Sequence, residues 1–178
     1  MASVKDPISD DRQIVELRGA PLHDRRLVFR DPVYASPEAI ARRYGDKTIW
    51  CVAEVHDEHD LSWLRTGSVS SLHAQITITA FEDDGVARFL RGLADDFRGW
   101  SGSRHWQSVN GQLRIDATHD GLGHVTLRFG LGDDRYPQES QWELSIPFTV
   151  EAGAELMALA DAFEVFFAAA TFQPGEEC

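Results

Sequence analysis

Hydrophobic and polar residues alternate along four stretches of the chain. Apolar residues hold every second position of residues 74–80, 113–117, 125–131 and 142–150. A period of two is typical of a β-strand that buries one face, whereas strands covered on both faces read as continuous apolar runs. The pattern therefore indicates antiparallel strands with one polar face each. Pro147 lies on the polar face of the last stretch and lacks a backbone donor, which predicts a sheet edge or a bulge there.

Two further stretches have helical spacing. A helix is predicted from Asp83 and Asp84, whose carboxylates would cap its start, to about Trp100. Its apolar residues recur three and four positions apart and form one stripe. A second helix is predicted over about residues 151–171, and Ser36-Pro37 predicts a short third one.

Shorter apolar segments predict strands in the first third of the chain. These segments are residues 13–18, 27–30 and 48–55. The acidic stretch 56–60 that follows them is predicted as a turn or loop, because charged runs are usually solvated surface.

Tight turns separate the later strands. Asn110-Gly111 is a hairpin signal, since a type I′ turn needs positive φ at both central residues, and Gly121 to Gly123 predict the next turn. These elements predict an α+β fold, a meandering antiparallel sheet of about six or seven strands with two main amphipathic helices packed on one face. We expect an N-terminal tail over residues 1–11, a single α+β domain over 12–172 and an acidic C-terminal tail over 173–178.

Composition and charge exclude several classes of protein. Hydrophobic residues are 43% and charged residues 26% of the 178, which is typical of a globular protein and not of a disordered one. The net charge of −12 repels phosphate backbones and anionic membranes, so neither nucleic acid nor membrane is an expected partner. Lys5 and Lys47 are the only lysines, a bias towards arginine that a high-GC bacterial genome would produce. Without a signal-peptide pattern, we expect a cytoplasmic bacterial protein.

The cysteines and glycines of the chain predict neither a disulfide framework nor a nucleotide-binding loop. Cys51 and Cys178 are too few for a disulfide framework, and Cys51 is expected to be a buried small hydrophobe. No glycine-rich phosphate loop joins a strand to a helix, and no cofactor is predicted.

The stretch of residues 56–60 is the densest group of potential ligands. His56 and His59 stand three apart with carboxylates around them, an arrangement that could hold a metal on a turn. No second ligand cluster has a standard spacing, so no metal site is predicted. Asp57, Glu58 and Asp60 are instead candidates for binding a partner.

Two histidines bracket the predicted turn at Gly121 to Gly123. His119 and His124 could approach each other across its mouth, with Asp120 orienting one ring as in general acid–base catalysis. Structural use of the same residues in the turn is the alternative. Trp100 and Trp106 could line a ligand pocket, or they could seal the seam between a helix end and a sheet.

Polar residues on the predicted strands would form one outer face of the sheet. Such a face is usually solvated, but it can also dock a protein and orient it through its charges. Its expected members, with Arg114, Asp116 and Arg128 as the binding candidates, are Thr77, Thr79, Arg114, Asp116, Thr118, Thr126, Arg128, Glu143 and Ser145.

Three motifs resemble a family of small actinobacterial domains of unknown function. They are residues 100–106, 111–115 and 119–127, and the helix before them and the segment 151–156 follow the same order. The resemblance covers about residues 68–170. More distantly, the strand–helix–strands–helix order resembles the WapI-type immunity proteins, which protect a bacterium from its own toxin. The resemblance brings no catalytic residues.

Two hypotheses of function follow. The first is a non-catalytic, immunity-like binding protein that occludes a toxin or another protein, with a basic partner attracted by the acidic chain. The second is a small-molecule enzyme, or a ligand-binding accessory protein of a bacterial biosynthetic pathway, that uses His119, Asp120 and His124 with Trp100 and Trp106 as pocket walls.

Overall fold

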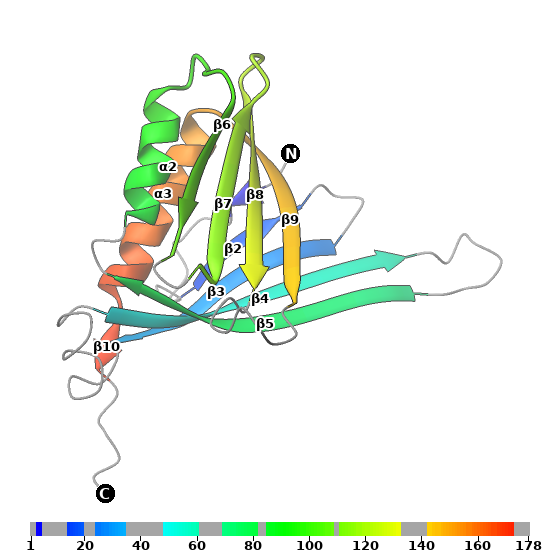
Figure 1. Cartoon of the computed structure of the whole chain (residues 1–178), viewed down its shortest axis with the longest axis vertical. Coiled ribbons are helices and arrows are strands. Elements are labelled where there is room, and N and C mark those ends of the chain that lie inside the picture. The colour runs from blue at the N-terminus through cyan, green and yellow to red at the C-terminus, as the bar shows by residue number, and fades with distance from the viewer. Residues whose placement is uncertain are drawn as a thin grey trace, which may run out of the picture.

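A computed structural model describes residues 3–4, 14–19, 24–34, 48–60, 69–81, 85–108, 111–132 and 142–172. Within these ranges the chain forms two sheets and two helices (Figure 1). Among the described residues, neither helix is long and apolar enough to cross a membrane.

The larger sheet contains the N-terminal strands and the last strand of the chain. Its main path runs in the order β1-β2-β3-β4-β5 with antiparallel neighbours, and β10 pairs in parallel with β3. The register between β3 and β4 shifts between Arg30 and Val33, where Asp31 has a φ of 54°. The strands are β1 (Ser3–Val4), β2 (Ile14–Arg18), β3 (Asp24–Tyr34), β4 (Thr48–Asp60), β5 (Val69–Phe81) and β10 (Thr171–Phe172).

The smaller sheet is a four-stranded antiparallel meander. Its order is β6-β7-β8-β9, so β9, which contains Pro147, is an edge strand as predicted. Gly111, Gly121 and Gly123 of the predicted turns have positive φ and lie between neighbouring strands, while Asn110 lies outside the described residues. The strands are β6 (Ser103–Gln107), β7 (Leu113–His119), β8 (His124–Gly132) and β9 (Glu143–Glu151).

The two helices are α2 (Val86–Asp95) and α3 (Ala154–Ala168), and they pack side by side. The prediction for α2 was too long, because the chain leaves the helix at Asp96 and turns through Gly99, which has a φ of 110°. The residue at its N-cap is Gly85, without a side-chain cap; Asp83, Asp84 and the predicted Ser36 helix lie outside the described residues.

The α+β class is confirmed, but the prediction of one sheet is wrong. Alternation shows which face of a strand is apolar and does not show which strand lies next to it. After β5 the chain passes through α2, and β6 then begins a new sheet instead of extending the first. The prediction of a turn at residues 56–60 is also wrong, because β4 continues through them in register with β5.

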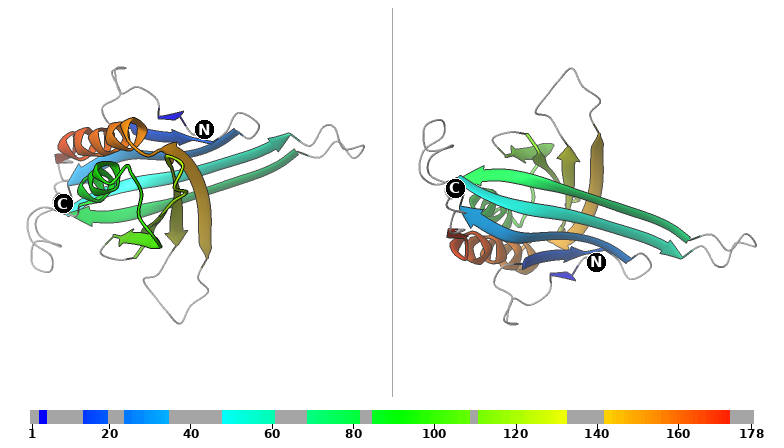
Figure 2. Two further views of the ribbon diagram at one scale, coloured as in Figure 1. Left: turned by 90° about the horizontal axis from the view of Figure 1, so that it is seen from above. Right: turned by 90° about the horizontal axis from the view of Figure 1, so that it is seen from below.

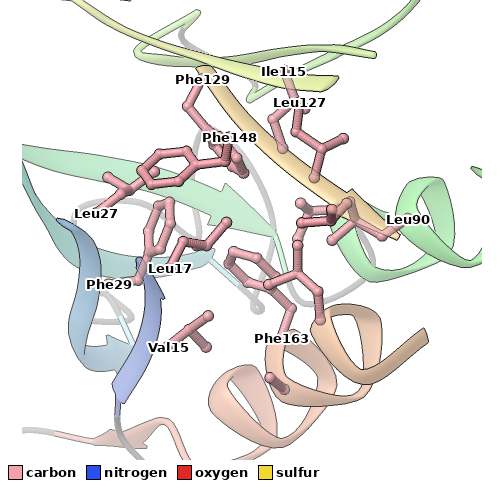
Figure 3. Close-up of a cluster of buried hydrophobic side chains, with 14 of the residues drawn as sticks. Val15, Leu17, Leu27, Phe29, Leu90, Ile115, Leu127, Phe129, Phe148 and Phe163 are labelled. Atoms are coloured by element: carbon pink, nitrogen blue, oxygen red, sulfur yellow. The ribbon is translucent and has the colours of Figure 1, made fainter. Parts of the chain in front are cut away.

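Both sheets and both helices share one core. In Figure 1 the smaller sheet faces the reader, the helices lie behind it and to its left, and the larger sheet passes below. Phe29 of β3 is the residue at which these layers meet (Figure 3). Its ring centroid lies 6.3 Å from that of Phe129 in β8 and 5.1 Å from that of Phe163 in α3. Stability of the domain therefore depends on contacts between segments far apart in sequence.

We expect Cys51 to resist alkylation in the native protein. Its side chain is buried on the core face of β4, and burial raises the pKa of the thiol to about 12. Little of the reactive thiolate exists at pH 8 under these conditions. Iodoacetamide followed by peptide mapping should leave Cys51 unmodified until denaturant is added. Rapid labelling of Cys51 without denaturant would contradict its placement in the core.

Candidate functional site

The outer face of the smaller sheet is the side turned away from the core. No described element lies in front of this face in Figure 1 or in the two views of Figure 2. The strand registers arrange its residues in three rows that cross the sheet from β6 to β9. The rows are Ser103, Thr118, Thr126 and Thr149; His105, Asp116, Arg128 and Pro147; and Gln107, Arg114, Gly130 and Ser145.

The first row is a line of hydroxyl groups. The Oγ1 atoms of Thr126 and Thr149 lie 3.4 Å apart on neighbouring strands. Hydroxyls both donate and accept hydrogen bonds, so this row can match either kind of group on a partner.

The middle row carries the charges. Asp116 Oδ1 lies 3.0 Å from His105 Nδ1, and Arg128 is the register partner of Asp116 on the other side. Arg128 is exposed and has no hydrogen bond or ion pair to any residue that the structure describes. A guanidinium without a partner among the described residues can bind a carboxylate or a carbonyl group of another protein.

The third row contains a glycine, Gly130, between two polar residues. Arg114 lies between Gln107 and Gly130, and its Nη1 is 3.7 Å from Glu143 Oε1 near the end of β9. Gly130 contributes no side chain to the outer face. The three rows together form a polar surface that carries charges of both signs.

Most of the predicted face is present, with one correction. Thr77 and Thr79 belong to β5 of the larger sheet and not to this face. The other seven residues lie on the smaller sheet as predicted. Sequence reasoning missed four residues that the strand registers add: Ser103, His105, Gln107 and Thr149. Alternation within residues 103–107 is the signal that would have found three of them.

The turn between β7 and β8 is built around Asp120. Its Oδ1 accepts hydrogen bonds from the backbone N–H groups of Leu122 at 2.6 Å and His124 at 3.0 Å. Its Oδ2 lies 3.1 Å from His124 Nδ1. The bonds from the backbone of His124 and Leu122 lower the pKa of the Asp120 carboxyl. Asp120 therefore orients one histidine ring, as the catalytic hypothesis requires, and also shapes the turn.

His119 is used differently from His124. Gly121 N donates to its Nδ1 at 2.8 Å, and its Nε2 lies 3.2 Å from the carbonyl oxygen of Phe97. Nδ1 is thus an acceptor and Nε2 carries the proton. His119 follows the core-facing residues of β7, and its ring packs edge-on against Trp100 at 5.1 Å. The two histidines lie on different sides of the hairpin, and His119 ties this hairpin to the turn after α2.

The same network holds two apolar side chains in solvent. Phe97 is 53% exposed and Leu122 is 84% exposed, at the end of the domain where the hairpin and the turn after α2 meet (Figure 1). Neither was predicted to be exposed, because Phe97 fits the apolar stripe of the predicted helix and Leu122 lies within the predicted turn.

We expect Asp120→Ala to loosen the β7–β8 turn. Without the carboxylate, the amides of Leu122 and His124 lose their acceptor, and their hydrogen exchange should become roughly tenfold faster. Asp120→Asn keeps a side-chain oxygen at the same place and should have a smaller effect. Because the pKa of Asp120 is lowered in the folded state, its stabilising effect is full above the ordinary aspartate pKa and is lost as pH falls below it. Unchanged exchange in Asp120→Ala would contradict the bonds described.

Trp100 and Trp106 are partly buried and pack against the hydrophobic core. The ring of Trp100 has the Arg104 guanidinium 4.6 Å from its centroid, and its buried Nε1 has no hydrogen-bond partner among the described residues. Trp106 lies in β6 opposite Ile115 and covers the core. This packing agrees with a seal between the helix end and the sheet.

The acidic candidates lie at the far end of β4. His56 Nε2 is 3.8 Å from Glu54 Oε2, and the side chains of Asp57, Glu58, His59 and Asp60 lie outside the description. In an extended strand, backbone positions three apart are about 10 Å from each other, so the turn proposed to bring His56 and His59 together does not exist. Among the described residues, no group of three or more His, Cys, Asp or Glu side chains could hold a metal ion.

Fold and site together define an α+β domain with two antiparallel sheets, one of which presents an open polar face. Residues 49–170 match a family of unknown function, DUF6228, and the chain belongs to this family. The match begins before the resemblance noted in the sequence, so it also includes all but the first residue of β4. No curated protein and no solved structure matches the chain.

Proposed function

We propose that this protein is a non-catalytic protein-binding domain whose contact surface is the outer face of the smaller sheet. The observation that carries the proposal is Arg128, an exposed guanidinium near the middle of a four-stranded face, with no hydrogen bond or ion pair to any described residue. Arginine is enriched among the residues that dominate binding energy, and such residues lie near the centre of an interface.

The surroundings of Arg128 fit this role. Hydroxyl groups on one side and Gln107, Arg114 and Ser145 on the other supply hydrogen-bonding groups on strands, which hold them rigidly. A surface that is ordered before binding loses less side-chain freedom when a partner arrives.

The expected partner is a basic protein. The described ranges hold 16 acidic and 10 basic residues, so half of the net charge of −12 belongs to them and half to the rest of the chain. This charge attracts a basic protein at long range, while the outer face makes the close contacts. The element order that resembles WapI-type immunity proteins supports a bacterial toxin as the class of partner and the bacterial cytoplasm as the place of binding.

Salt dependence of association tests this proposal. The partner is captured from lysate of the source cell, purified, and its association rate is measured at about 0.05 and 0.5 M salt. Screening should slow association by about tenfold or more, because the Debye length shortens from more than 10 Å to a few ångströms. An association rate that does not change with salt would exclude steering by the acidic chain.

A second candidate is a small-molecule enzyme or ligand-binding accessory protein, and the Asp120–His124 contact favours it. Asp120 holds His124 Nδ1 and leaves Nε2 directed elsewhere, as in a histidine that acts on a ligand. His119 supplies no second base, since both of its ring nitrogens already have partners. Native mass spectrometry of the purified protein tests this candidate: a small molecule held by the wild type and lost in His124→Ala would support it.

A further inference from the structure

The free edge of β5 is the least protected strand edge of the described structure. β5 has 13 residues and ends the main path of the larger sheet, with β4 as its partner on one side. All of its positions pair with β4 without a register shift. In the right-hand view of Figure 2 it forms the margin of the larger sheet.

An unpaired edge exposes backbone donors and acceptors, and proteins normally protect such edges with short strands, charges, prolines or bulges. The other edges have these features. β1 has two residues, β6 has five and contains Arg104, and β9 contains Pro147 between two glutamates. Residues 69–81 contain no Asp, Glu, Lys or Arg, no proline and no glycine.

We propose that β5 binds an extended segment of a partner protein by β-strand addition. This is a second contact surface, separate from the outer face of the smaller sheet, and it does not depend on the function proposed above. Main-chain hydrogen bonds along the edge would supply affinity, and alternate side chains would supply specificity.

The register between β4 and β5 indicates the residue type at every second position of the partner segment. Ala74, Ile76 and Ile78 are the register partners of Val55, Ala53 and Cys51, which are buried in the core. A new strand continues these rows beyond β5. Apolar residues at every second position of the segment would therefore extend an apolar row.

The acidic residues of β4 indicate which residues would stand between the apolar positions of the partner segment. Glu58 and Asp60 of β4 lie within the span that pairs with β5, at backbone positions that alternate with those of the apolar row. A strand added to β5 lies about 10 Å from β4, close enough for these charges to act on it at physiological salt. Lysine or arginine between the apolar residues would complement them. A second copy of this chain would instead bring another acidic β4 and another net charge of −12.

Three nine-residue peptides of alternating lysine and valine test the proposal on the full-length protein. The first is unmodified, the second is N-methylated at every valine, and the third is N-methylated at every lysine. Successive amides of a strand point to opposite edges, so each methylated peptide loses the donors of one edge. Charge and side chains stay the same in all three.

Strand addition predicts that the unmodified peptide binds and that only one of the methylated peptides loses at least about tenfold in affinity, measured by fluorescence anisotropy. Amide exchange should slow at alternate residues of 69–81 in the complex. Equal binding of all three peptides, protection confined to other residues, or no binding at about 1 mM would each overturn the proposal.

Discussion

We expect Phe29→Ala to lower the free energy of unfolding by about 3–5 kcal/mol. Phe29 is 1% exposed, and its ring contacts Phe129 of the smaller sheet and Phe163 of α3. Truncation leaves a cavity where three layers meet, and these layers cannot all close on it at once. Urea denaturation followed by tryptophan fluorescence gives the free energy of unfolding.

Val28→Ala is the matched control for this variant. Val28 is the neighbour of Phe29 in β3, points to the opposite face and is only half-buried. Its truncation should cost less than about 1 kcal/mol. Similar losses for Val28→Ala and Phe29→Ala would show that the two sheets and α3 do not share the core described.

Arg128→Glu should weaken binding of the partner by about 30-fold or more, which corresponds to the roughly 2 kcal/mol typical of a central interface residue. The substitution removes the exposed guanidinium and places a carboxylate near Asp116 and the partner. Surface plasmon resonance with the purified partner measures the change in Kd, and circular dichroism checks that the fold is retained.

Arg88→Glu controls for the change of charge. Arg88 is exposed on α2, away from the outer face, and its substitution alters the net charge by the same amount. We expect an affinity within about threefold of the wild type, because only long-range attraction changes. Equal losses in both variants would show that Arg128 acts through total charge and not through contact.

Local patterns predicted most elements of the fold but not their assembly. Period-two alternation located β7, β8 and β9, and helical spacing located α3, because each pattern arises within one element. Whether β6 joins β5 depends on how α2 turns the chain, and this involves contacts between residues far apart. Phe97 and Trp100 fit the stripe of α2 but lie beyond its end, since Gly99 allows a turn that the periodicity does not reveal.

For the candidate sites too, the sequence predicted what arises within one strand and not what depends on contacts between elements. Alternation placed Arg114, Asp116 and Arg128 on one face, and the structure confirms this placement. Proximity in sequence suggested that His119 and His124 face each other, yet one binds the turn after α2 and the other binds Asp120. Contacts between elements decide such details, and sequence spacing does not encode them.

Methyl cross-saturation in the purified complex tests the central claim most directly. Thr118, Thr126 and Thr149 carry methyl groups on the outer face, and the exposed Ala158 and Ala168 carry methyl groups on α3 as internal controls. The observed protein is deuterated except at its labelled methyl groups, and the partner is unlabelled. When the protons of the partner are saturated, the saturation reaches the protein only across the contact surface. We predict signal loss at the three threonines and none at the two alanines. Loss at the alanines with the threonines unchanged would contradict binding through the smaller sheet.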